Sequence, residues 1–180
     1  MNQFSNRLMR AARLDPGVYE EIESDRDSLG QAALAVILSS VAAGVGMLSF
    51  HGDLAAFFWG MIAALVSWIF WAWMVTLIGT RWMPERQTSS NLGEMLRVLG
   101  FASAPGFIRI FGAVAALREV VFLAAAIWMM AAMVIAVKQA LDYRSTGRAA
   151  AVCLVGWMLQ TALFFLVLGI SGAFNEAASS

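Results

Sequence analysis

The sequence predicts an all-α protein, a polytopic membrane helical bundle. Of its 180 residues 61% are hydrophobic and 13% are charged, whereas an ordinary soluble domain has about 25% charged residues. The apolar residues gather in runs of about 20, the length at which an α-helix crosses a hydrocarbon core roughly 30 Å thick. Charged residues fall mainly between these runs. We therefore expect five transmembrane helices, preceded by an N-terminal amphipathic helix.

Residues 1–28 are predicted to form a cytoplasmic amphipathic and acidic segment. Residues 2–14 carry apolar side chains at helical spacing on one side and arginines on the other: Phe4, Leu8, Ala11 and Ala12 against Arg7, Arg10 and Arg13. This pattern is typical of a helix that lies on an anionic membrane surface, and an ordinary surface helix shows it as well. Asp15 and Pro16 then suit the N-cap and the first position of a second helix.

The transmembrane domain is predicted over residues 29–172, and its first two spans cover 29–50 and 54–79. The first span has small residues at every fourth position: Ala35, Ser39 and Ala43. Such a line lets another helix approach closely. We therefore expect it to be a helix-binding face.

The third span, 98–117, carries features that the other spans lack. Gly100 and Pro105 predict a helix break, and Arg109 places a charge inside the span. An arginine at the membrane centre costs about 2.5 to 3.5 kcal/mol on insertion scales, so it should face protein or water. Two interpretations stay open. Arg109 belongs to an ion path or substrate site, or it snorkels or pairs with an acidic residue near the outer face: Glu119 or Asp53.

Spans at 120–140 and 149–170 and a polar tail at 173–180 complete the chain. With five crossings and a cytoplasmic N-terminus, every Lys and Arg except Arg109 and Arg118 lies inside. With four crossings, three basic residues would move outside, against the positive-inside rule: Lys138, Arg144 and Arg148. We therefore expect a bacterial inner-membrane protein with its C-terminus outside.

The residue inventory argues against catalysis. His51 is the single histidine and Cys153 the single cysteine, which leaves no His-based or multi-Cys metal site and no credible catalytic His pair. The sequence has no phosphate-binding Gly loop. Its net charge is zero, so it lacks the excess of positive charge that is typical of nucleic-acid-binding domains. We expect no enzyme activity, no cofactor, no metal and no nucleic-acid partner.

An acidic stretch follows Pro16 and is a candidate binding segment: Tyr19, Glu20, Glu21, Glu23 and Asp25. A hard cation needs several converging oxygens, which one helix alone does not supply. Docking is favoured instead, either on a partner protein or on an arginine of the next cytoplasmic region: Arg81, Arg86 or Arg97.

Three segments resemble the Yip (Ypt-interacting protein) domain family: 15–25 with Gln31 and Ala32 following, 100–105, and 136–141. Their order and spacing extend the resemblance over nearly the whole chain. It implies a cytoplasmic N-terminus and five helices, and eukaryotic members are trafficking proteins that associate with Rab-type GTPases and with one another. This chain departs from them in Phe101, where they usually carry Tyr, and in its short N-terminal region.

The leading functional hypothesis is a non-enzymatic membrane scaffold or accessory subunit. It would bind other integral membrane proteins, or a second copy of itself, through small-residue helix faces and the acidic segment. One alternative is a small transporter or channel with Arg109 and the Pro105 helix break near its path. Another is a lipid- or curvature-sensing protein that acts on membrane lipids through residues 2–14.

Overall fold

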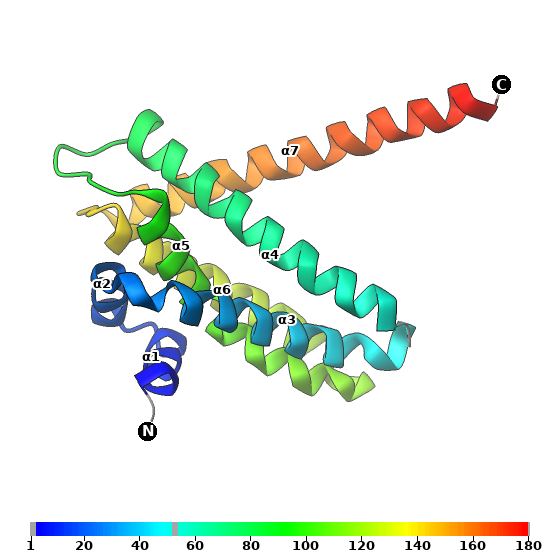
Figure 1. Cartoon of the computed structure of the whole chain (residues 1–180), viewed down its shortest axis with the longest axis horizontal. Coiled ribbons are helices and arrows are strands. Elements are labelled where there is room, and N and C mark those ends of the chain that lie inside the picture. The colour runs from blue at the N-terminus through cyan, green and yellow to red at the C-terminus, as the bar shows by residue number, and fades with distance from the viewer. Residues whose placement is uncertain (1–2, 52–53, 180) are drawn as a thin grey trace.

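The computed structural model describes residues 3–51 and 54–179, and within them the side chains except at 48–51, 54, 56, 164 and 167–179. The described residues form helices and loops and contain no strand. The elements are α1 (Gln3–Ala12), α2 (Pro16–Ser24), η1 (Arg26–Ser28), α3 (Leu29–His51), α4 (Leu54–Leu77), η2 (Ile78–Trp82), α5 (Leu92–Phe101), η3 (Ala104–Ala113), η4 (Ala115–Leu117), α6 (Arg118–Ala140) and α7 (Thr146–Ser179). Figure 1 shows the long helices running between two ends of the molecule.

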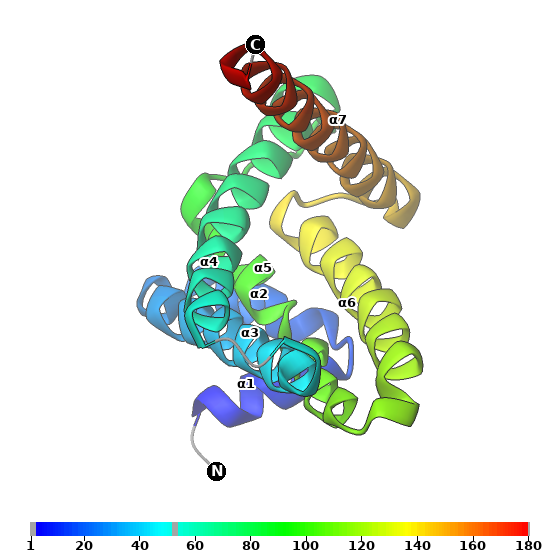
Figure 2. The ribbon, with the colours of Figure 1, turned by 90° about the vertical axis from the view of Figure 1, so that its right-hand side faces the viewer.

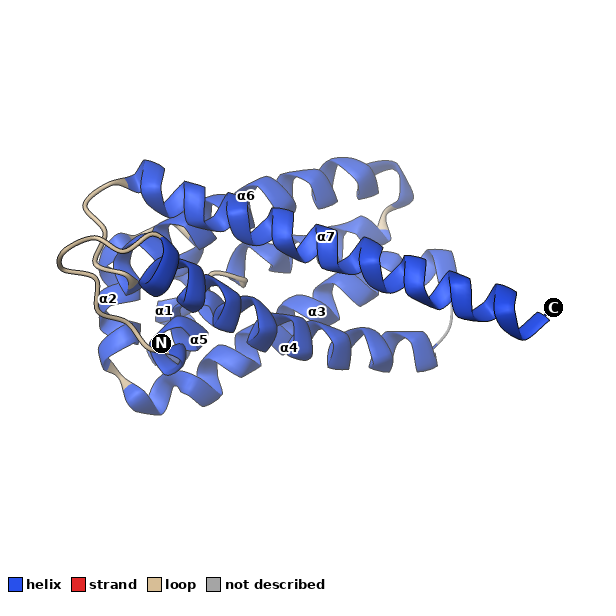
Figure 3. Cartoon of the chain, turned by 90° about the horizontal axis from the view of Figure 1, so that it is seen from above, coloured by secondary structure: helices blue, strands red, loops and turns tan. Residues whose placement is uncertain are grey.

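The connections between helices gather at these two ends. The loop between η2 and α5 and the loop between α6 and α7 lie with α2 at one end, called here the α2 end (Figure 1). The junction of α3 with α4 and the η4 turn lie at the opposite end (Figures 1 and 3). Successive long helices therefore alternate in direction, as the spans of a polytopic protein do.

Four stretches of the described residues are long and apolar enough to cross a membrane: Arg26–Met47, Phe57–Trp82, Leu92–Ala113 and Ala115–Ala140. The predicted count of five spans is therefore not confirmed. The fifth predicted span, 149–170, lies in α7, where the side chains of 164 and 167–179 fall outside the described residues. The α7 helix continues through most of the predicted polar tail.

The third span begins earlier than predicted and is built from two kinds of helix. Its start moves to α5 because Asn91 and Glu94 form a capping box: the Asn91 side chain accepts a hydrogen bond from the Glu94 amide at 3.1 Å, and the Glu94 carboxylate accepts one from the Asn91 amide at 3.0 Å. The chain leaves α5 at Ala102 and Ser103 and continues as η3, a 3₁₀-helix of 10 residues. Isolated 3₁₀ segments are rarely longer than about four residues.

The observed break, at Ala102 and Ser103, lies between the two residues that predict it, Gly100 and Pro105. Gly100 lies inside α5, whereas Pro105 occupies the first turn of η3 as a helix-starting residue. Gly100 instead allows α5 and α3 to pack closely. A Cβ at this position would lie 2.6 Å from the Ala32 Cβ and 2.8 Å from the Ala32 carbonyl oxygen. This glycine lets α5 lie directly against α3.

The bundle has a packed part and a splayed part. η3 lies between α3 and α6, and α5 packs against α2, α3, α4 and α6. Figure 2 shows α4 and α7 extending away from this group, and in Figure 1 these two helices diverge from the α2 end. The core residues are accordingly contributed mainly by the packed part and by the near ends of α4 and α7.

α4, α6 and α7 are fastened together at the α2 end. The Tyr143 hydroxyl lies 3.0 Å from the Gly79 carbonyl oxygen and 2.6 Å from that of Met83, at the π-helical η2 turn. Arg148 at the start of α7 donates to the Pro84 carbonyl at 3.0 Å. These bonds join η2 and the two residues after it to the loop that follows α6 and to the start of α7.

The N-terminal segment forms a helix, α1, but an amphipathic helix lying on the membrane surface is not confirmed. α1 packs on the bundle: the Trp128 indole donates to the Ala12 carbonyl at 2.8 Å, and the ring of Phe4 meets that of Phe101 edge to face at 6.0 Å. Arg7, predicted on the outer basic side, is 2% exposed. It turns inward because two carboxylates of the acidic segment lie beneath it.

Candidate functional site

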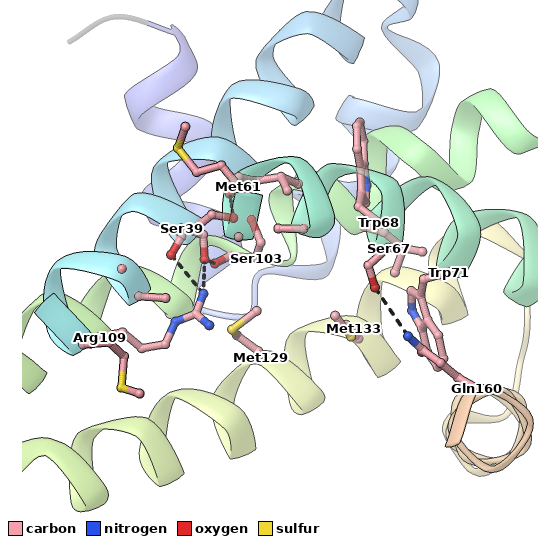
Figure 4. A pocket seen from close by; sticks show the side chains of 18 of the residues that line it. Ser39, Met61, Ser67, Trp68, Trp71, Ser103, Arg109, Met129, Met133 and Gln160 are labelled. Carbon is pink, nitrogen blue, oxygen red and sulfur yellow. Dashed lines mark hydrogen bonds between the residues drawn. The ribbon is translucent and has the colours of Figure 1, made fainter. Parts of the chain in front are cut away.

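A cavity of about 510 Å³ lies between α3, α4, η3, α6 and α7. This volume is within the usual range for small-molecule sites. Its walls are mainly apolar, and methionines from α4 and α6 form part of them (Figure 4): Met61, Met129 and Met133. Polar side chains enter the cavity at two places.

Arg109 of η3 forms the first polar place. Its Nε donates to the Gly106 carbonyl at 3.0 Å, and its Nη2 donates to the Ser39 carbonyl at 3.0 Å and to the Ser39 hydroxyl at 2.7 Å. All three acceptors are uncharged, and Nη1 makes no hydrogen bond to the described part of the chain. The side chain is thus held in position while its charge stays uncompensated by any described carboxylate.

The two acidic partners predicted for Arg109 do not change this result. Glu119 is exposed and forms no salt bridge with Arg109 within the described ranges. Asp53 lies outside the described residues. Both interpretations of Arg109 therefore stay predictions, and its place in the cavity wall is the observation on which the polar-site interpretation rests.

Ser39 connects Arg109 to the break in the third span. Its hydroxyl donates to the Ser103 carbonyl at 3.0 Å, which also accepts the Gly106 amide at 2.9 Å as η3 begins. Ser39 is ten positions after Leu29, about 15 Å along the axis of α3. The guanidinium group therefore lies beside the middle of α3, whereas the Arg109 carbonyl lies beside Gly46, nearer the end of α3.

The second polar place combines Ser67 of α4 with Gln160 of α7, whose side-chain amide donates to the Ser67 hydroxyl at 3.4 Å. Trp71 lies beside them, is 5% exposed, and stacks on Trp157 with ring centroids 6.1 Å apart. The buried Trp71 Nε1 has no hydrogen-bond partner among the described residues. A buried donor without a partner costs about 1–3 kcal/mol and is uncommon in native proteins.

Figure 4 shows the two polar places at opposite sides of the cavity. Arg109, Ser39 and Ser103 lie on one side, and Met129 and Met133 separate them from the second group. The second group consists of Ser67, Trp71 and Gln160. The cavity is therefore an apolar space with a cation at one end and neutral hydrogen-bonding groups at the other.

The small residues predicted as a partner-binding face lie on the inner side of α3. Ala35 and Ser39 are 0% and 2% exposed, and Ala43 is half-buried in the cavity wall. A Cβ at Gly106 would overlap the Ser39 hydroxyl. This line brings α3 close to η3 within the chain, which is the use of small residues expected in membranes.

The acidic segment is largely engaged inside the chain. Tyr19 is fully buried, and Glu20 is exposed and accepts a hydrogen bond from Gln139 at 2.7 Å. Glu21 and Asp25 form salt bridges with Arg7 at 2.8 and 2.7 Å. The hydrogen bonds from Arg7 lower the pKa of both carboxyl groups.

Glu23 and Arg97 hold α2 against α5. Arg97 donates to the Ile22 and Glu23 carbonyls, so it docks the acidic segment through the main chain rather than through carboxylates. Burial, with repulsion from Glu94 and Asp142, raises the pKa of Glu23 to about 7. The described residues contain no group of three or more His, Cys, Asp or Glu side chains arranged to hold a metal ion.

A family model for the Yip1 domain matches residues 14–168. The chain belongs to the Yip1 domain family. The match covers most of the chain and all four membrane-spanning stretches, which makes this Yip1 domain protein an integral membrane protein. No curated protein and no solved structure matches the chain.

In this Yip1 domain protein, the sequence predicts the side of the cavity that contains Arg109 but not the side that contains Trp71 and Gln160. Arg109 is conspicuous because it is a charge inside an apolar run. Gln160 carries the same kind of signal, since a side-chain amide inside a predicted span should find a polar partner. Trp71 and Arg7 give no comparable signal, because hydropathy does not show which way an indole or a flanking arginine points.

Proposed function

We propose that this Yip1-family protein is a small, non-enzymatic membrane transporter or channel that accepts an anionic ligand at Arg109. One observation carries the proposal: Arg109 lines an intramembrane cavity and is held by uncharged groups. A charge in a low-dielectric site is costly unless an opposite charge accompanies it. An anion that enters the cavity would supply that charge.

The broken third span supports the same function. Many transporters form their sites near the midplane with discontinuous helices, whose freed backbone groups and helix ends face the ligand. Here the chain changes from α-helix to 3₁₀-helix next to Ser103, and Arg109 follows in the second turn of η3. The first turn of η3 is buried against α3 and α6, whereas Ile110 and Phe111 near its end are 47% and 62% exposed.

For its orientation we propose five spans in a bacterial inner membrane, with the N-terminus cytoplasmic and the C-terminus outside. The separation of the connections to two ends supports this arrangement (Figure 1). The loop arginines Arg86 and Arg144 lie with α1 and α2 at the same end, as the positive-inside rule requires.

Anion flux in liposomes tests the function. We expect wild-type protein to conduct or exchange small anions, Arg109→Gln to abolish this flux, and Arg109→Lys to retain part of it because the positive charge remains. Arg86→Gln, at an exposed loop position, is the matched control and should leave the flux unchanged. Equal flux from wild type and Arg109→Gln would refute the proposal.

A scaffold or accessory subunit is the second candidate, and the outer face of α4 favours it. Trp59, Val66 and Trp73 are 70%, 61% and 49% exposed there, and aromatic residues are common at protein interfaces. Its partners would be other integral membrane proteins or a second copy of the chain, with no nucleic acid. Extraction in mild detergent should then yield a stoichiometric partner or a homo-oligomer, and the flux assay should be negative.

Sensing of lipid composition or curvature through residues 2–14 is the remaining proposal. Arg13 is exposed at the end of α1, where it can meet anionic lipid head groups. Arg13→Glu should then alter localisation in cells without unfolding the protein, whereas deletion of residues 2–14 would also remove the salt bridges of Arg7.

A further inference from the structure

We propose that the cavity binds single-chain anionic amphiphiles, with a carboxylate or phosphate head group at Arg109 and an apolar chain directed toward Trp71. This inference rests on the proposed function and specifies its ligand. It combines three observations: an uncompensated cation, an apolar middle section, and a buried donor without a partner at the far side. Each observation restricts a different part of the ligand.

The head group is restricted by Arg109. Nε and Nη2 are occupied by Gly106 and Ser39, while Nη1 is available. Arg109 is the one cationic side chain among the described residues that line the cavity. A single positive charge suits a singly charged head group, because a second negative charge would remain unpaired in the apolar surroundings.

The chain is restricted by the walls between the two polar places. Met129 and Met133 lie along α6 between Arg109 and Trp71 (Figure 4), and Met61 of α4 also lines the cavity. Methionine side chains are flexible and adapt to irregular apolar partners. Relative to water, each buried methylene contributes about 0.8 kcal/mol, so the affinity expressed against the aqueous ligand concentration should rise about fourfold per methylene until the cavity is filled.

The far end of the ligand is restricted by Trp71. Its buried Nε1 lacks an acceptor, and Gln160 and Ser67 lie on the same side of the cavity (Figure 4). An amphiphile whose chain ends in an oxygen would accept a hydrogen bond from this nitrogen. A hydrogen bond of typical net strength corresponds to about a two- to tenfold preference for such a ligand.

The route of entry fits a ligand dissolved in the membrane. α4 and α7 both line the cavity, and they diverge from each other toward the end opposite α2 (Figures 1 and 2). An amphiphile in the bilayer can approach between two diverging helices without crossing water.

Photo-crosslinking of the full chain in phosphatidylcholine nanodiscs tests the ligand class. The probe is a decanoic acid with a diazirine in its chain, and mass spectrometry locates the crosslinks, which we expect at Met129 and Met133. Unlabelled decanoate, decyl phosphate, decanol and acetate serve as competitors. We expect decanoate or decyl phosphate to compete at least tenfold better than decanol or acetate, and the stronger of the two identifies the head group.

Three variants probe the two ends separately. Arg109→Gln should weaken decanoate binding about 30-fold or more, since it removes one partner of a buried charge pair, and Arg109→Lys should restore part of the affinity. Trp71→Phe should remove the preference for 10-hydroxydecanoate over decanoate, measured as the ratio of the two affinities within the same variant. Trp73→Phe, at a 49% exposed position of α4, is the matched control and should keep that preference.

The outcomes separate this inference from the function on which it rests. If acetate competes as well as decanoate while Arg109→Gln abolishes binding of both, the amphiphile inference fails and an anion site at Arg109 remains. If no probe depends on Arg109, both fail. Gel filtration shows whether Arg109→Gln folds. If it does not, the inference is still tested by the competitor series on wild-type protein and by ligand binding to Arg109→Lys and Trp71→Phe.

Discussion

At the scale of single residues, Arg7 fastens the first helix to the second. Its side chain is 3% exposed and binds Glu21 and Asp25, whose side chains are 39% and 29% exposed. Arg7→Ala should lower the free energy of unfolding by about 1–3 kcal/mol, less than for a fully buried pair because water can solvate the two carboxylates. Thermal unfolding in detergent measures this. Arg13→Ala, at an exposed position, should change stability by less than about 0.5 kcal/mol, and equal effects of the two variants would contradict the prediction.

Glu23 makes stability depend on pH. Its pKa rises from 4.5 to about 7 on folding, so between these values the folded state holds a proton that the unfolded state has lost. Stability therefore decreases as the pH rises through this window. Glu23→Gln removes the dependence, and its advantage over wild type should grow from pH 5 to pH 8. Melting temperatures across that range provide the measurement, and parallel curves would argue against it. Glu21 and Asp25 have lowered pKa values and act at more acidic pH.

Local signals in the sequence predict some residues well and others not at all. The N-cap role of Asp15 follows from its position before Pro16, and its carboxylate accepts from the Gly17 amide at 3.0 Å. The inward turn of Arg7 does not follow from helical spacing, because spacing defines the sides of a helix but not which side another element covers. The acidic segment that covers it comes from α2, after a reversal at Leu14 with φ 62°.

At the scale of elements, the contact of α5 with α3 depends on Gly100. An added methyl group would overlap the backbone of Ala32, which cannot move as a flexible side chain can. Gly100→Ala should therefore lower stability by about 1–3 kcal/mol. Gly30→Ala is the matched control, since a Cβ there meets nothing within 4 Å, and it should be neutral or stabilising by up to about 1 kcal/mol. Thermal unfolding compares them, and a neutral Gly100→Ala would mean that α5 and α3 can separate without loss.

Hydropathy predicts where helices exist better than where they change type. The apolar runs of α3, α4 and α6 give those helices to within a few residues. The third span differs because its start is set by the Asn91 and Glu94 capping box and its second half is wound as a 3₁₀-helix. The capping signature is present in the sequence, whereas the 3₁₀ winding arises from packing of η3 between α3 and α6.

At the scale of the whole molecule, the orientation in the membrane is open to a direct test. In a Cys153→Ala background, single cysteines at two exposed positions report the two ends: Arg86→Cys in the loop after η2 and Ala116→Cys in η4. A membrane-impermeant maleimide added to intact bacterial spheroplasts should label Ala116→Cys and should label Arg86→Cys only after lysis. The reverse result would invert the proposed orientation, and labelling of both without lysis would exclude η3 from crossing.

The cavity itself is a property of the assembled molecule. Its two polar sides come from α3 and η3 on one hand and from α4 and α7 on the other. A single sequence shows that Arg109 needs a polar environment, but it does not show which distant residues supply that environment. Ser39 lies 70 positions before Arg109 along the chain, so only the fold brings them together.

The fastening of α4, α6 and α7 at the α2 end has a mechanical consequence. Tyr143 binds Gly79 of η2 and Met83, directly after α4 ends. α3 and α5 pack along α4 itself, and Trp68 of α4 donates to the Leu96 carbonyl. A displacement of α4 has to break these contacts together, so the cavity wall formed by α4 is expected to stay with the bundle when a ligand binds.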